Sequence, residues 1–91
     1  MPRFFLNIHN GLGFARDDEG IDLPNLEAAR DKAIEGVRSI LSEEIKGGAL
    51  DLLGRIEITD DSGNILAQVP FSDAVDISMP GGSLGKVSND Q

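Results

Sequence analysis

Acidic side chains gather in two short segments that could act as cation ligands. The first segment contains Asp17, Asp18, Glu19 and Asp22. An EF-hand loop needs Asp or Asn at its first, third and fifth positions, Gly at its sixth and Glu at its twelfth. Setting Gly20 at the sixth position puts Ala15 first, and the second segment, which begins Asp60–Asp61, fails in the same way. We interpret both segments as solvated turns; weak binding of a hard cation by the first is the alternative.

Catalytic patterns are missing from the rest of the sequence. His9 is the only histidine, and no serine occupies a recognisable nucleophile turn, so His9 is expected to face solvent near a strand end rather than act as a general base. The glycines near Lys86 resemble a P-loop, but three residues separate Gly81 from Gly85 where four are needed, and Val87 follows the lysine. We therefore predict no catalytic residues, no metal and no cofactor.

Arg30 is the one charged residue in an otherwise apolar stripe. It lies about 40° from the centre of the apolar face of the helix predicted below, where an unpaired charge is costly. We predict that its stem covers the core and that its guanidinium pairs with a carboxylate of the first acidic segment: Asp17, Asp18 or Asp22. An anion-binding role for Arg30 is the alternative.

The composition limits the partners that the chain can bind. The 91 residues include 16 acidic and 8 basic side chains, a net charge of −8, and the basic ones are scattered. Nucleic acid and anionic membranes are therefore not expected as partners, whereas a basic protein is electrostatically favoured. There is no cysteine, and no signal-like or membrane-spanning apolar run is evident, so the expected location is the cytoplasm.

The segment Asn25 to Lys46 is predicted to be a helix, because its apolar residues recur at helical spacing. As the longest predicted element, it must position the strands and turns that carry the acidic residues. Asn25 is a good N-cap, and Gly47 with Gly48 supplies a C-terminal stop. The apolar face comprises Leu26, Ala29, Ala33, Ile34, Val37, Ile40 and Leu41.

Alternating or branched residues predict four strands: Arg3–His9, Phe14–Arg16, Arg55–Thr59 and Asn64–Phe71. The predicted order is β-β-α-β-β, an α+β fold with a mainly antiparallel four-stranded sheet and one helix on one face. We assign residues 1–75 to one domain and the Gly-rich, polar residues 76–91 to a flexible tail.

One helix covers only one face of such a sheet, and the other face retains apolar residues. A bare apolar patch is rare on a soluble monomer. The sequence therefore predicts a homodimer through the helix-free face, with Phe5, Ile65, Val69 and Phe71 as interface residues.

Several segments together resemble a bacterial family of short proteins that is described only as a domain of unknown function. They are the opening Met-Pro-Arg-Phe-Phe, the run Asp17–Gly20, the segment Leu23–Arg30 and the turn glycine Gly63. The resemblance covers residues 1 to about 75 and implies a bacterial, soluble protein, with no activity to transfer. Family members often carry Asp or His where this chain has Asn7.

The sequence thus favours a small non-enzymatic interaction module over an enzyme. A second hypothesis is an acidic inhibitor or antitoxin-like protein that binds a basic protein partner. A small enzyme joining His9 to the acidic segment is the third.

Overall fold

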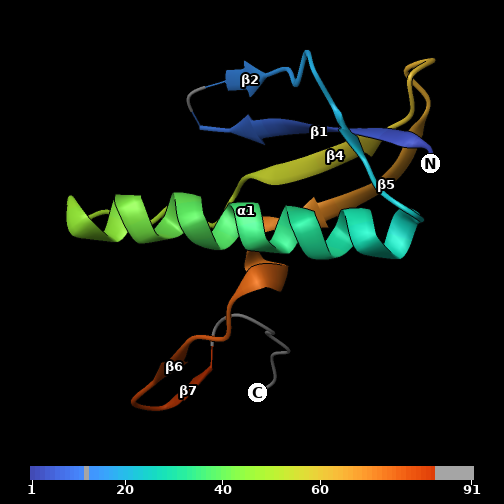
Figure 1. The fold of residues 1–91 in the computed structure, drawn as a ribbon. Helices are drawn as coiled ribbons and strands as arrows, with labels where there is room; N and C mark the ends of the chain where they lie inside the picture. Colours follow the sequence, from blue (N-terminus) through green and yellow to red (C-terminus); the bar gives the residue numbers. More distant parts are fainter. Residues whose placement is uncertain (12, 84–91) are drawn as a thin grey trace.

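The computed structural model describes residues 1–11 and 13–83, in which one long helix packs on one face of an antiparallel sheet (Figure 1). The helix α1 spans Leu26–Lys46; the sheet consists of β1 (Arg3–Asn10), β2 (Gly13–Ala15), β3 (Ile21–Asp22), β4 (Arg55–Thr59) and β5 (Ile65–Pro70). The predicted α+β class is confirmed, with the order β-β-β-α-β-β. No helix of the described residues has the length and apolar character needed to cross a membrane.

Helix α1 begins and ends where its capping residues predict. Asn25 has an extended backbone (φ −162°), and its side-chain oxygen accepts a hydrogen bond from the Ala28 N–H at 2.8 Å. At the other end the Gly48 N–H donates to the Ile45 carbonyl at 2.9 Å, with Gly48 at φ +87°, a left-handed conformation that glycine adopts without strain. The residues buried between these caps recur every fourth position: Ala29, Ala33, Val37 and Leu41.

Strand β1 lies inside the sheet. It pairs antiparallel with β4 along one side and with both β2 and β3 along the other, and β4 continues to β5. Leu6 of β1 stands opposite Ile58 of β4, which in turn stands opposite Ala67 of β5. This row belongs to the sheet face that α1 covers, since Ile58 is completely buried.

The short strand β3 is not among the four strands that the sequence predicts. Two residues are too few to show an alternating pattern. In the structure they pair with the first residues of β1, Asp22 opposite Arg3 and Ile21 opposite Phe4. The side of β1 away from β4 is therefore shared by two short strands, with residues 16–20 looping out between them.

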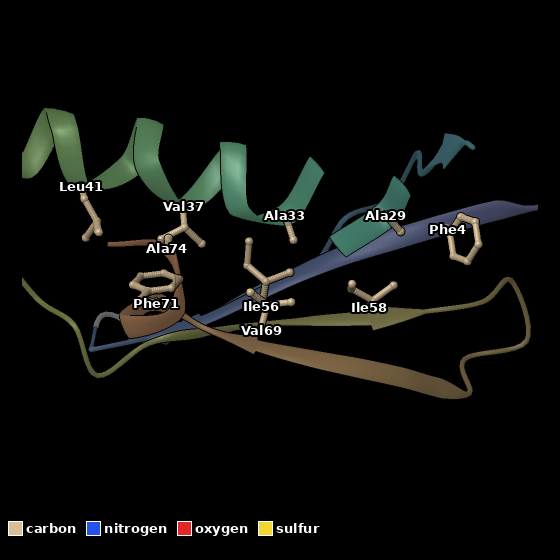
Figure 2. Packing of buried hydrophobic residues seen from close by; sticks show 10 residues of the cluster. All are labelled: Phe4, Ala29, Ala33, Val37, Leu41, Ile56, Ile58, Val69, Phe71 and Ala74. Atoms are coloured by element: carbon tan, nitrogen blue, oxygen red, sulfur yellow. The ribbon is translucent and has the colours of Figure 1, made fainter. Parts of the chain in front are cut away.

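The core fills the space between α1 and the sheet (Figure 2). The small side chains of Ala29 and Ala33 lie over the sheet in the first half of the helix, while Val37 and Leu41 lie over a short helix that follows β5 (Figure 2). The other buried apolar residues come from the strands and that short helix: Phe4, Ile56, Ile58, Val69, Phe71 and Ala74.

After β5 the chain leaves the sheet and passes beneath α1. The predicted fourth strand ends one residue early, at Pro70, and the 3₁₀ helix η1 (Phe71–Ala74) follows. The Arg38 side chain of α1 donates a hydrogen bond to the Ala74 carbonyl at 2.7 Å and so fixes η1 to the helix. Strands β6 (Ser78–Met79) and β7 (Gly82–Ser83) then form a small separate hairpin, drawn below α1 in Figure 1.

The proposed boundary at residue 75 stays a prediction. It falls between η1 and the β6–β7 hairpin, so part of the predicted tail, residues 76–83, contains a pair of short strands. Residues 84–91 of that tail lie outside the described residues.

Candidate interaction face

The two faces of the sheet differ in chemistry. Because successive strand residues point to opposite faces, the buried Phe4 assigns Phe5, Asn7 and His9 to the face away from α1. Thr59 of β4 stands opposite Phe5, and Glu57 stands opposite Asn7. The middle of the helix-free face is therefore polar, in contrast to the apolar face under the helix.

A groove of about 320 Å³ runs across this helix-free face. It lies between the loop that separates β2 from β3 and the turn that joins β4 to β5. Asn7 and Thr59 lie in its floor, and its charged and aromatic lining consists of Asp17, Asp18, Glu57, Asp60, Asp61, Arg16, Phe5 and Phe14. We call this feature the acidic groove.

Asp17 holds one wall of the acidic groove against β1. One carboxylate oxygen accepts the Leu6 N–H at 3.1 Å, and the other accepts the N–H groups of Glu19 at 3.2 Å and Gly20 at 3.0 Å. In return the Asp17 N–H donates to the Asn7 side-chain oxygen at 2.8 Å. The Asp17 side chain thus takes the place of a strand partner in the gap between β2 and β3.

These contacts set the charge of Asp17. Partial burial raises its pKa, but the hydrogen bonds from the N–H groups of Gly20, Leu6 and Glu19 together outweigh burial and hold the pKa below the ordinary value of 3.8. Asp17 is therefore ionised at neutral pH. Most of its hydrogen-bonding capacity is used within the fold.

Asp60 plays the same part in the opposite wall. Its carboxylate accepts the side-chain amide of Asn64 at 3.0 Å and the backbone N–H groups of Asn64 and Ser62 at 2.9 Å. The side-chain hydrogen bond from Asn64 contributes most to lowering the Asp60 pKa below its ordinary value, and the backbone donors add to it. Gly63 closes the turn at φ +86°. The neighbouring Asp61 is exposed.

A protein-family model matches the part of the chain that forms the sheet, the helix and the groove. A model of a domain of unknown function, DUF6894, matches residues 3–72, from the first residue of β1 into η1. The chain belongs to the DUF6894 family. This confirms the resemblance to a domain-of-unknown-function family. Searches of curated proteins and of solved structures found no match.

The matched part of this DUF6894 chain contains α1, all five strands of the main sheet and every residue that lines the acidic groove. The β6–β7 hairpin lies after it. The groove is therefore a feature of the segment that defines family membership.

The ion pair predicted for Arg30 is not among those in the described part of the DUF6894 chain. Arg30 is exposed, and Asp22 is held instead by Arg3, whose Nε and Nη2 donate to its two oxygens at 3.0 and 3.2 Å. The cause is β3, because its pairing places Asp22 directly opposite Arg3. Asp18 lies 3.6 Å from Arg16, with both side chains mostly exposed.

The four predicted interface residues lie in two different environments. Phe5 lines the acidic groove, and Ile65 is 56% exposed at the start of β5. Val69 and Phe71 are 2% and 0% exposed and belong to the core under α1, so they are not available on the helix-free face. The reason is strand pairing: Val69 stands opposite the buried Ile56, and Phe71, two residues further along, points to the same face and donates its N–H to the Gly54 carbonyl.

His9 lies beside the acidic groove rather than in its lining. Its Nε2 atom is 3.3 Å from a Glu57 carboxylate oxygen, and its ring centroid is 4.6 Å from that of Phe14. The Nε2 atom is buried and makes no hydrogen bond in the structure, so the contact with Glu57 is an ion pair when the ring carries a proton. Among the described residues, no three His, Asp or Glu side chains converge as a metal site would require.

Sequence reasoning found the acidic segments of both walls but not that they face each other across one groove. The segment around Asp17 is conspicuous in the sequence, whereas Glu57 and Asp61 carry no local pattern that joins them to it. The signal that unites them is the pairing of β1 with β4, which places Asn7 opposite Glu57 across 50 positions of sequence. In the sequence, the two walls can be recognised only as two similar turns, Asp17–Gly20 and Asp60–Gly63, each of which begins with an acidic pair and ends with glycine.

Proposed function

We propose that this DUF6894 chain is a small protein-interaction module that binds a basic segment of a partner protein in its acidic groove. The observation that carries the proposal is the lining of the groove: five carboxylates and one arginine, with two phenylalanines among them. Lys and Arg side chains carry both the charge and the apolar stem that such a lining accommodates.

The carboxylates of the groove fall into two groups. Asp17 and Asp60 are occupied by backbone N–H groups and give the walls their shape. Asp18 and Asp61 are exposed, so their oxygens are accessible to a ligand. A basic segment lying along the groove would meet Asp18 on one wall and Asp61 on the other.

The aromatic residues supply a second attraction for cations. Phe14 is 55% exposed and Phe5 is partly buried, and both border the groove. A cation over the face of an exposed phenylalanine gains about 0.5–1 kcal/mol beyond its ion pairs. This favours Arg over Lys in the bound segment, because a guanidinium plane stacks on an aromatic ring.

The same acidity weighs against a homodimer through the helix-free face. Two copies meeting there would bring the carboxylates of both grooves together, which costs free energy unless cations intervene. The net charge of −8 adds to that repulsion. A basic partner would experience neither the repulsion between two acidic grooves nor the repulsion between two negatively charged chains. An acidic inhibitor that binds a basic protein is one example of such an interaction.

A labelled, capped deca-arginine peptide tests the proposal by fluorescence anisotropy. The double variant Asp18→Asn/Asp61→Asn is expected to bind it about tenfold more weakly than the parent, equivalent to about 1.4 kcal/mol. The matched control is Asp31→Asn/Glu35→Gln, which removes the same charge from the exposed side of α1. Its affinity should stay close to that of the parent.

Equal losses in the two double variants would contradict the proposal, because net charge rather than the groove would then govern binding. A Phe14→Leu variant separates stacking from simple apolar contact and should weaken binding by about threefold. A pull-down from the native host with the parent and the Asp18→Asn/Asp61→Asn variant then identifies a physiological partner. That partner should be basic and should be recovered only by the parent.

A further inference from the structure

The two edges of the main sheet are protected to different degrees. One edge consists of β2 and β3, of three and two residues, and the acidic loop of Asp17 interrupts it. The other edge is β5, six consecutive residues without a charge, although its register against β4 shifts at the Ile58–Thr59 step and Pro70 lies at its end. Short strands, charges, bulges and prolines all hinder unwanted strand pairing, so β5 is protected only at its two ends and its middle is open.

The hydrogen bonds of β5 show which of its backbone groups face outward. The Phe71 N–H donates to the Gly54 carbonyl at 2.9 Å, and Val69 is the next residue to face β4 because inward-facing groups alternate along an antiparallel pair. Gln68 therefore directs its N–H and C=O away from the sheet. Pro70, which has no N–H, directs only its carbonyl outward, so it does not leave a donor unpaired.

Two large apolar side chains accompany this free backbone. Ile65 is 56% and Leu66 is 41% exposed at the start of β5. Among the described elements, none pairs with the outer side of β5, and β6 and β7 pair with each other in a separate two-stranded sheet.

We propose that a second copy of this chain pairs with β5, edge to edge and antiparallel, so that two sheets become one. The two-fold axis passes beside Gln68, where the two Gln68 residues exchange N–H···O=C hydrogen bonds. Leu66 then stands opposite Pro70 of the other copy. Both α1 helices lie on one face of the joined sheet, and both acidic grooves lie on the other.

The charges near β5 favour a second copy as the occupant. From Ser62 to Ser72 the chain has no charged residue, so antiparallel pairing brings no carboxylates of β5 face to face despite the net charge of −8. Arg55 stands opposite Pro70 at one end of β5, where the exposed Asp73 follows, and Asp60 and Asp61 precede the other end. Antiparallel pairing places the Arg55 of each copy toward the Asp60–Asp61 turn of the other.

Sedimentation equilibrium of the full chain at about 10–100 µM tests the dimer by mass action. The expected mass is twice the 9.7 kDa of one chain. Leu66→Lys puts a charge at the edge and should restore the single-chain mass, with an unchanged circular dichroism spectrum. Leu53→Lys is the matched control, because Leu53 is 93% exposed and lies outside β5; it should remain dimeric.

A parent with the single-chain mass would overturn the proposal, and so would a Leu66→Lys variant that remains dimeric. Because the chain has no cysteine, Gln68→Cys supplies a second, geometric test. A short bis-maleimide should link two Gln68→Cys chains, and it should leave Leu53→Cys unlinked at the same concentration. Absence of linkage at residue 68 in a dimeric sample would place the interface elsewhere.

The Phe5→Lys variant distinguishes this dimer from one formed through the helix-free face. Phe5 lies in the acidic groove, away from the β5 edge, so the variant should remain dimeric. Dissociation of the Phe5→Lys variant would contradict the edge-to-edge arrangement. None of these measurements uses a basic ligand, so they stand or fall independently of the proposed function.

Discussion

Asp17 shows how one side chain can substitute for a strand. Its carboxylate occupies the place beside β1 where neither β2 nor β3 reaches, and it satisfies the Leu6 N–H there. An unpaired backbone donor that is shielded from water costs about 1–3 kcal/mol. The residue thus contributes to the fold and shapes the groove at the same time.

We expect Asp17→Asn to lower the free energy of unfolding by about 1–2 kcal/mol at neutral pH. An amide has one acceptor oxygen, whereas the Asp17 carboxylate accepts hydrogen bonds with both of its oxygens. Urea unfolding measures the loss. Asp18→Asn is the control, because Asp18 is exposed and its only described ion pair, with Arg16, is long.

The pH dependence of this effect has a definite sign. Since folding lowers the Asp17 pKa below 3.8, the stabilisation by the carboxylate is complete above that value and is lost as the pH falls through the lower, folded-state pKa. The stability difference between the parent and Asp17→Asn should therefore be smaller in acid than at neutral pH. A difference that is constant down to about pH 2 would show that ionisation of Asp17 does not stabilise the fold.

The arginines near the start of the chain and of the helix should differ in their effects. Arg3 binds both oxygens of Asp22 and also the Glu19 carbonyl at 2.7 Å, but the pair is about half exposed, which limits its contribution to about 1 kcal/mol or less. Arg3→Ala should lower the thermal midpoint by about 2–5 °C.

Arg30→Ala should change the thermal midpoint by about 1 °C or less. A large drop would instead support the ion pair between Arg30 and the first acidic segment that the sequence predicts.

At the scale of elements, two glycines have opposite roles. A Cβ at Gly54 would lie 2.7 Å from the His9 carbonyl oxygen and 2.7 Å from the ring of the buried Phe71, and neither group is free to move. A Cβ at Gly36, inside α1, would meet nothing within 4 Å. The connection into β4 therefore needs glycine, whereas the helix does not.

We expect Gly54→Ala to destabilise the protein by about 1–3 kcal/mol through overpacking. Gly36→Ala should stabilise it by about 0.5–1 kcal/mol, because alanine loses less conformational entropy in a helix. Chemical denaturation at one fixed protein concentration compares the two. Gly54→Ala at parental stability would mean that β4 and η1 separate more easily than their packing indicates.

The elements that the sequence predicts well are those with local signals. Helix α1 has a cap at Asn25 and a stop at Gly47–Gly48, and the hairpin before β5 has Asp60–Gly63. What the sequence misplaces depends on contacts between distant residues. Phe71 alternates with Val69, and both are buried under α1 because Val69 stands opposite the buried Ile56 of β4. The apolar pattern identifies Phe71 as a core residue without identifying its partners.

The candidate site is less predictable than the fold for the same reason. The acidic segment at Asp17 is visible in the sequence, but its neighbour across the groove, Asp61, becomes a neighbour only when β1 pairs with β4. Arg30 shows the converse. Its place near the apolar stripe suggests burial, but the buried face of α1 is a narrow line of residues at four-residue intervals, and Arg30 lies beside it.

At the scale of the molecule, the two proposals have a joint consequence. A dimer joined at β5 would display two acidic grooves on one continuous face. A partner with two basic segments could then occupy both, and its second contact would form at a high effective concentration. Such a partner would bind the dimer far more tightly than the single-chain Leu66→Lys variant.

The burial of Phe71 and Ala74 beneath α1 also fixes an order of events during synthesis. Residues 1–54 contain the N-terminal strands and the helix, but β4, the partner of β1, and the side chains that fill the space under Val37 and Leu41 are made later (Figure 2). Contacts that join residues so far apart in sequence make folding slow compared with that of a helical bundle. While the chain emerges from the ribosome, the apolar face of α1 therefore stays exposed to solvent until these later residues have been made. During that interval a chaperone could bind it, and the exposure ends when residue 74 becomes free to fold back.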